Sequence, residues 1–171
     1  MVVGGWFDAE DLYGPLETYK NIEKYNPGNY NTMVFGPWDH GGWARSKGRT
    51  AVGNYYFGDS ISEFYQEKIE TRFFNHFLKE EGYGDTGLPE AYVFDTGKKD
   101  WNTFDTWPPM KTKAKAFFLS ENQALTEDQT GEAGIQFVSD VKKPVPYSED
   151  INTDYTPRKY MTDDQRFAAR R

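Results

Sequence analysis

The sequence has no cysteine in its 171 residues, and its only histidines are His40 and His76. The absence of cysteine excludes both a disulfide framework and a zinc site with thiolate ligands. No stretch approaches the ~20 consecutive apolar residues that cross a bilayer, and residues 1–5 are too short and too uncharged for a signal peptide. We therefore expect no membrane partner. These absences do not distinguish a secreted or periplasmic bacterial protein from a cytoplasmic one.

Positive charge is also scarce, because 20 lysines and arginines face 27 aspartates and glutamates. The net charge of −7 and the pI of about 4.9 oppose binding to phosphates, so we expect no nucleic-acid partner. Aromatic residues, in contrast, make up 18% of the chain, which excludes an unstructured segment. The mean hydropathy of −0.86 indicates that most rings lie among polar residues, as they do on sheet faces and in aromatic-lined clefts.

The first 110 residues show the pattern of an α/β sheet. Short apolar runs at residues 1–3, Thr32–Gly36 and Ala91–Thr96 predict buried strands. Between them, apolar residues at helical spacing predict one helix over Asp11–Tyr25 and a longer one over roughly residues 60–80. Strand, helix and strand in this order predict parallel βαβ units, whose ligands bind at the carboxyl ends of the strands.

The pattern changes after Trp107-Pro108-Pro109. Residues Lys113–Leu119 alternate as a strand does, and glycines and prolines then mark turns at short intervals, which is typical of an all-β region. We therefore divide the chain into residues 1–110, part of an α/β domain, and residues 111–171, the first part of an incomplete β domain. The chain also begins within a predicted strand that no turn or cap precedes, which favours a piece of a longer protein.

Two side chains have the types and positions that acyl-transfer chemistry requires. Asp8 follows the first predicted strand, and His40 follows the second in a Gly-rich, Trp-flanked loop. Neighbouring parallel strands lie ~5 Å apart, so both side chains can meet at one edge of the sheet. A carboxylate there can accept a hydrogen bond from the imidazole Nδ1 and hold the ring in one tautomer. His76 lies on the long predicted helix, where a structural role explains it better.

The chain lacks the nucleophile that would complete such a site. In α/β-hydrolases the serine of G-x-S-x-G precedes the acid and the histidine. None of the six serines has that motif; the nearest match, Gly58-Asp59-Ser60-Ile61-Ser62, fails at its last position and follows His40. The chain therefore either is not such a hydrolase or lacks its front part.

Two Trp-containing motifs resemble a known family. Gly4–Asp8, the acid motif, and Gly36–Trp43, the histidine motif, are similar to the motifs around the acid and the histidine of the cocaine-esterase/X-Pro-dipeptidyl-peptidase hydrolases. The nearest branch is that of the α-amino-acid ester hydrolases and the proteins assigned as glutaryl-cephalosporin (glutaryl-7-ACA) acylases. Further similarity continues at Phe77-Leu78-Lys79, Trp101, Trp107-Pro108-Pro109 and Asp163–Phe167.

The resemblance implies an α/β-hydrolase sheet followed by the start of a jelly-roll β-sandwich. It implies that Asp8 is the triad acid, that His40 is the general base, and that the nucleophilic serine lies upstream. It also implies that Glu10 and Asp11 bind a substrate's α-ammonium group; the alternative is an acidic helix N-terminus, because Glu and Asp also favour the first turn of a helix. No cofactor is implied. The substrate would be a small ester, amide or peptide.

Other functions stay open at this point. Asp8, Glu10, Asp11, Asp39 and His40 offer oxygen and nitrogen ligands for a metal ion, although neither the H-E-x-x-H nor the EF-hand spacing is present. The aromatic residues also suit a non-catalytic module that binds carbohydrate or another ligand. Within the hydrolase interpretation, the bond cleaved can be an ester, an X-Pro peptide or a β-lactam side-chain amide. The sequence leaves a homo-oligomer of the full-length protein open.

Overall fold

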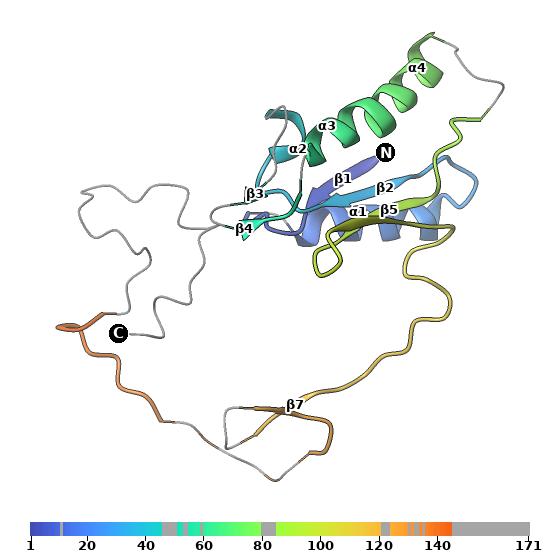
Figure 1. Cartoon of the computed structure of the whole chain (residues 1–171). Helices are drawn as coiled ribbons and strands as arrows, with labels where there is room; N and C mark the ends of the chain where they lie inside the picture. The colour runs from blue at the N-terminus through green and yellow to red at the C-terminus, as the bar shows by residue number, and fades with distance from the viewer. Residues whose placement is uncertain are drawn as a thin grey trace.

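The structure is a computed structural model, and it describes residues 1–10, 12–45, 51–52, 55–58, 60–79, 85–120, 124–129, 131, 134 and 136–144. Asp11, one of the predicted site residues, therefore lies outside the described residues, as does the Asp163–Phe167 similarity. Within the described part, helices lie on both faces of a four-stranded sheet (Figure 1). No described helix is long and apolar enough to cross a membrane.

The sheet is mixed, with strand order β1-β2-β5-β6. Strands β1 (Val2–Gly5), β2 (Met33–Gly36) and β5 (Ala91–Asp95) are parallel, as the βαβ pattern predicts. Strand β6 (Asp100–Phe104) is antiparallel to β5 and was not predicted. Its polar sequence lacks an apolar run, and a tight turn closed by hydrogen bonds to the Asp95 carboxylate brings it back along β5.

The β1–β2 connection is α1 (Tyr13–Tyr25), which confirms the first predicted helix. It packs on one face of the sheet, where Tyr19 contacts a buried cluster formed with β2 and β5. Met33 and Phe35 of β2 point to this face, whereas Val34 belongs to the cluster on the other face. The two-residue alternation of a strand therefore places apolar side chains on both faces of β2, and the whole strand is buried.

The second predicted helix is continuous over residues 61–79 and covers the other face. It consists of α3 (Ile61–Phe64), a π-helical segment η1 (Tyr65–Glu70) and α4 (Thr71–Lys79), together called the long helix. Its first half buries Ile61, Tyr65 and Ile69 against the sheet. Its second half projects past the sheet (Figure 1), and Phe77 and Leu78 are exposed there.

Between β2 and the long helix, the described residues contain three short elements. Helix α2 (Gly42–Arg45) begins inside the histidine motif, and β3 (Ala51–Val52) pairs with β4 (Tyr55–Tyr56).

Beyond residue 110, β7 (Phe118–Leu119) and β8 (Leu125–Thr126) form an antiparallel pair. The predicted strand over Lys113–Leu119 is thus only two residues long. This pair is the extent of the β-structure in the described residues of that region, so the jelly roll stays a prediction.

Candidate active site

The acid and histidine motifs meet at the carboxyl ends of β1 and β2. The parallel register pairs Gly5 with Gly36, the last residues of the two strands. Backbone hydrogen bonds continue past the strands: the Trp6 N–H donates to Gly36 O (2.9 Å), and the Phe7 N–H donates to Trp38 O (3.0 Å). This pairing keeps the segments that follow β1 and β2 side by side up to the predicted site residues.

Asp8 and His40 are brought together as predicted. His40 Nδ1 lies 3.1 Å from Asp8 Oδ2 and 3.3 Å from Oδ1. The Asp8 side chain is 4% exposed and that of His40 is 43% exposed. The Glu10 N–H donates to Asp8 Oδ1 (2.9 Å), which helps to orient the carboxylate. A buried carboxylate on Nδ1 favours the tautomer that carries its proton there, and this leaves Nε2 free to accept one.

Glycines at the strand ends allow this close approach. A Cβ at Gly5 would collide with the backbone carbonyl of Trp38, and one at Gly36 would collide with the Trp38 ring. A Cβ at Gly4 would collide with the Phe35 ring. Gly4, Gly5 and Gly36 are therefore required by the packing of the neighbouring strand and of the Trp38 residue, independently of any catalytic role.

Each motif has a tryptophan two residues before its candidate catalytic residue, and both indole N–H groups are bonded. Trp6 Nε1 donates to Phe94 O (3.0 Å) on β5. Trp38 Nε1 donates to Ser62 Oγ (3.0 Å) on the long helix, and both partners are buried. The Trp38 ring also packs edge-on against Tyr65, with ring centroids 5.3 Å apart. Nothing in the sequence pattern singled out Ser62 or Phe94 as partners of the site.

The other predicted site residues differ in how far the structure describes them. Glu10 Oε2 lies 3.8 Å from His40 Nε2, and the Glu10 side chain is 49% exposed. Asp11 cannot be placed beside it, because Asp11 lies outside the described residues. His76 lies on α4, where its ring packs edge-on against Phe77 with centroids 4.7 Å apart.

The metal alternative has no cluster to support it in the part of the chain that is described. No three His, Asp or Glu residues there lie close enough together to hold a metal ion. The set proposed from the sequence includes Asp11, which is not among those residues.

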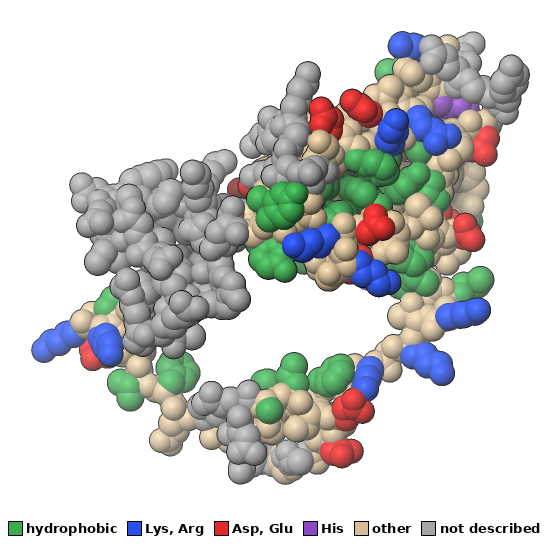
Figure 2. Space-filling view, in the orientation of Figure 1, with side chains coloured by type: hydrophobic (Ala, Val, Ile, Leu, Met, Phe, Trp, Pro, Cys, Tyr) green, Lys and Arg blue, Asp and Glu red, His purple; other side chains and the backbone are tan. Residues whose placement is uncertain are grey.

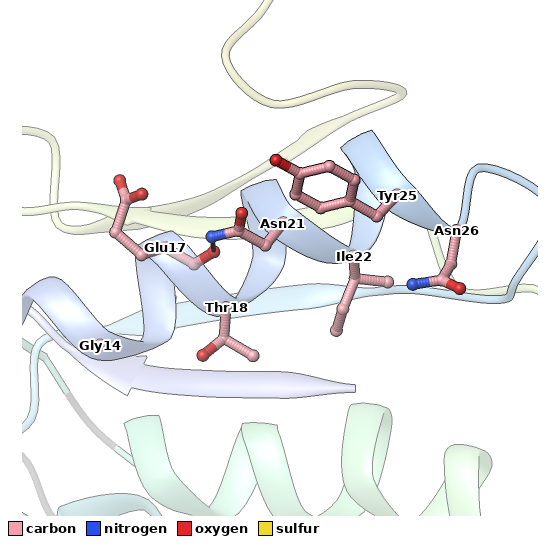
Figure 3. A pocket seen from close by; sticks show the side chains of 7 residues that line it. All are labelled: Gly14, Glu17, Thr18, Asn21, Ile22, Tyr25 and Asn26. Carbon is pink, nitrogen blue, oxygen red and sulfur yellow. Dashed lines mark hydrogen bonds between the residues drawn. The ribbon is translucent and has the colours of Figure 1, made fainter.

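A separate groove of about 560 Å³ follows the exposed side of α1 (Figure 3). It is lined by Gly14, Glu17, Thr18, Asn21, Ile22, Tyr25 and Asn26. Asn21 turns back onto its own helix, donating from Nδ2 to Glu17 O (2.7 Å), so its amide is already bonded. The groove contains none of the residues of the acid and histidine motifs.

Comparisons with known proteins identify similar solved structures. No protein-family model matches the sequence, and no curated protein matches it significantly. The structure of an aminopeptidase from a marine sediment archaeon, a Thaumarchaeota archaeon, is 30% identical over 99% of this chain, with a TM-score of 0.80. An α-amino acid ester hydrolase labelled with selenomethionine is 26% identical over 98% of this chain, also with a TM-score of 0.80.

These likenesses extend over almost the whole of this chain but over a small part of the other proteins. The chain covers 28% of the aminopeptidase and 29% of the ester hydrolase. Both the identity and the fold agree with the resemblance predicted from the two motifs, which is thereby confirmed.

Proposed function

Because the chain resembles hydrolases of the cocaine-esterase/X-Pro-peptidase type in its motifs and in its structure, we propose that it carries the acid and the histidine of a serine hydrolase. The likeness by itself supports a hydrolase. The Ser-His-Asp mechanism is our proposal, and the contact between His40 Nδ1 and Asp8 carries it.

The proposed roles follow from this contact. Asp8 keeps the proton of the neutral ring on Nδ1, so that Nε2 accepts the serine proton as the serine oxygen attacks an ester or amide carbonyl. The imidazolium that forms is stabilised by the Asp8 carboxylate, and it gives its proton to the leaving group as the acyl-enzyme forms. Water then attacks the acyl-enzyme by the same route and releases the acid.

The nucleophile is proposed to come from outside this chain. Ser62, whose hydroxyl contacts the histidine motif, is fully buried, and this hydroxyl bonds to Trp38 Nε1 and to Gly42 O. Among the described residues, the polar partners of the His40 ring are Asp8 and Glu10, and neither is a nucleophile for this chemistry. We therefore expect the chain alone to be inactive. We also propose that residues 111–171 begin a jelly-roll domain of the full-length enzyme.

The proposed substrates are esters or amides of acyl or α-aminoacyl groups. Glu10 offers a half-exposed carboxylate within 4 Å of the His40 ring, where it can bind a substrate ammonium group. Asp11 would add a second carboxylate to this subsite. Substrates with a free α-amino group should therefore react faster than the same esters without it.

A chimera tests the proposal. Residues 1–171 replace the matching segment of the α-amino acid ester hydrolase, whose remaining part supplies the rest of that enzyme, and hydrolysis of an α-amino ester is measured. We expect activity in the chimera and a fall in kcat of about 10⁴-fold in His40→Gln and in Asp8→Asn. The matched control is His76→Gln, which should retain the activity.

Two outcomes would contradict the proposal. A folded, active chimera that is indifferent to His40→Gln would show that the histidine is not the base. Ester hydrolysis by the chain alone that disappears in His40→Gln would show that no outside nucleophile is needed.

A further inference from the structure

We propose that Ser62 and Gln66 of the long helix are positioning residues that hold the histidine motif so that His40 meets Asp8. The inference rests on the proposed function, because it concerns how that same pair is kept in place. It adds two residues of the long helix, both more than 20 positions from His40 in the sequence.

Three side-chain hydrogen bonds join the long helix to the histidine motif. Trp38 Nε1 donates to Ser62 Oγ (3.0 Å), and Ser62 Oγ donates to Gly42 O (3.2 Å). Gln66 Nε2 donates to Trp43 O (2.8 Å). The three bonded residues of the motif lie two positions before His40 and two and three positions after it, so the bonds bracket the catalytic candidate on both sides.

The motif has little regular structure of its own between these points. The Gly42 N–H donates to Asp39 O (2.9 Å), and the Ala44 N–H donates to Gly41 O (3.1 Å), so the backbone forms tight turns. Gly41 has a φ of 69°, which side-chain-bearing residues rarely adopt. The carbonyls of Gly42 and Trp43, at the start of the four-residue helix α2, accept hydrogen bonds from the side chains of Ser62 and Gln66.

Ser62 is suited to this role because it is fully buried and its hydroxyl both accepts one hydrogen bond, from Trp38 Nε1, and donates another, to Gly42 O. A hydroxyl has one proton to donate and two lone pairs to accept with. Replacing it with a methyl group would leave the Trp38 N–H and the Gly42 carbonyl without this partner in a dry environment. Both groups lie within two residues of His40, so the motif would shift to recover these hydrogen bonds.

Gln66 reaches its target from the π-helical turn. Residues 65–70 wind with one extra residue per turn, and the Thr71 N–H and hydroxyl both bond to Gln66 O, the latter at 2.6 Å. Ser62 and Gln66 are four residues apart and thus lie on one face of the helix, beside the apolar face that carries Ile61, Tyr65 and Ile69. Such π turns are frequent at functional sites.

The test uses nuclear magnetic resonance of the chain with ¹⁵N in its histidine rings. The chain has only two histidines, so the spectrum contains two rings, and His76 on α4 reports whether the long helix is intact. Spectra are recorded over a series of pH values, and the nitrogen shifts of the neutral form of each ring give the ratio of its two tautomers. The variants are Ser62→Ala and Gln66→Met, and Glu67→Gln, an exposed change on the same helix, is the control.

We expect His40 to be held as the Nδ1–H tautomer in the parent chain. Each of the two variants should lower the ratio of the Nδ1–H to the Nε2–H tautomer by about fivefold, which corresponds to the net free-energy contribution of one ordinary hydrogen bond. The His76 signals and the Glu67→Gln spectrum should match the parent. If Ser62→Ala shifts the His76 signals too, the helix has been disturbed, and Gln66→Met alone decides.

Asp8→Asn separates this inference from the function on which it rests. If the His40 tautomer ratio changes in Asp8→Asn but not in Gln66→Met or Ser62→Ala, the positioning role is wrong. The proposed contact between Asp8 and His40 is then still supported. If the His40 tautomer ratio is the same in Asp8→Asn as in the parent chain, the proposed pair of Asp8 and His40 is wrong, and so is the positioning role that depends on it.

Discussion

Residues 1–110 and the described residues after them differ in what their apolar side chains contact. In the first region, two clusters bury side chains on both faces of the sheet, and no member of either lies beyond Trp107. In the described part of the second region, Leu119, Phe137 and Val138 are each more than 80% exposed. Figure 2 shows apolar side chains gathered along the long helix and scattered along the stretch that follows the sheet.

The comparison indicates why the candidate site lies in the first region. A catalytic pair needs strands whose register is enforced by burial, and β2 is buried along its whole length. Strands β7 and β8 have two residues each, and β7 carries one of the exposed leucines. Alternating apolar residues are therefore sufficient to predict a strand, but a partner surface is needed to bury its apolar face.

The largest expected effect is at the centre of the first region. Trp38→Ala removes a ring that is 1% exposed and packs against Tyr65 and Trp101. It should lower the free energy of unfolding by about 3–5 kcal/mol, measured by urea unfolding followed by circular dichroism. Phe137→Ala, at a site 86% exposed, should change it by less than about 0.5 kcal/mol. Equal costs would abolish the contrast between the regions.

A single methyl group should show the same contrast more finely. At Gly5 a Cβ would collide with the backbone carbonyl of Trp38. A backbone atom cannot move away by a change of rotamer, so Gly5→Ala should destabilise the chain by about 1–3 kcal/mol. At Gly134 a Cβ would meet nothing within 4 Å. Thermal unfolding of the two variants is the measurement, and an unaffected Gly5→Ala would contradict the described register of β1 and β2.

Alkaline pH should weaken the first region through its buried tyrosines. Burial and the nearby Glu70 carboxylate raise the pKa of Tyr65 above its usual value, and burial and a hydrogen bond to Glu90 do the same for Tyr19. The folded chain therefore keeps these protons at a pH where the unfolded chain loses them. The stabilisation is fully present below about pH 10 and falls above it by at most about 1.4 kcal/mol per pH unit for each tyrosine.

Tyr65→Phe tests this pH dependence. Urea unfolding at about pH 9 and pH 11 should show a smaller loss of stability in Tyr65→Phe than in the parent chain. Tyr13→Phe is the matched control, because Tyr13 is 75% exposed. An equal loss in the parent and in Tyr65→Phe would rule out Tyr65 as a source of the alkaline sensitivity.

The smallest effect is expected from removing the second region. A chain of residues 1–110 retains every member of both clusters, so its free energy of unfolding should stay within about 0.5 kcal/mol of that of the whole chain. A chain of residues 1–99 also loses Trp101, which packs with Phe94 at 5.4 Å, and it should be clearly less stable. Loss of folding on removal of residues 111–171 would show that the two regions depend on one another.

The sequence by itself determined the local chemistry and the order of the elements. Side-chain spacing was sufficient for α1, the long helix and the three parallel strands, because burial on one or two faces leaves a periodic trace. It was also sufficient to choose Asp8 and His40, because a polar residue that directly follows a buried strand can be recognised in the sequence. The polar strand β6 left no such trace, and neither did the π turn of the long helix.

Only the tertiary structure decided how these parts meet. The register that pairs Gly5 with Gly36 brings His40 Nδ1 to 3.1 Å from Asp8, and no spacing rule fixes a register. The hydrogen bonds of Ser62 and Gln66 to the histidine motif join residues more than 18 positions apart. Such contacts depend on how a helix packs across the sheet, and that packing is set by side-chain volumes on both surfaces together, so neither segment specifies it alone.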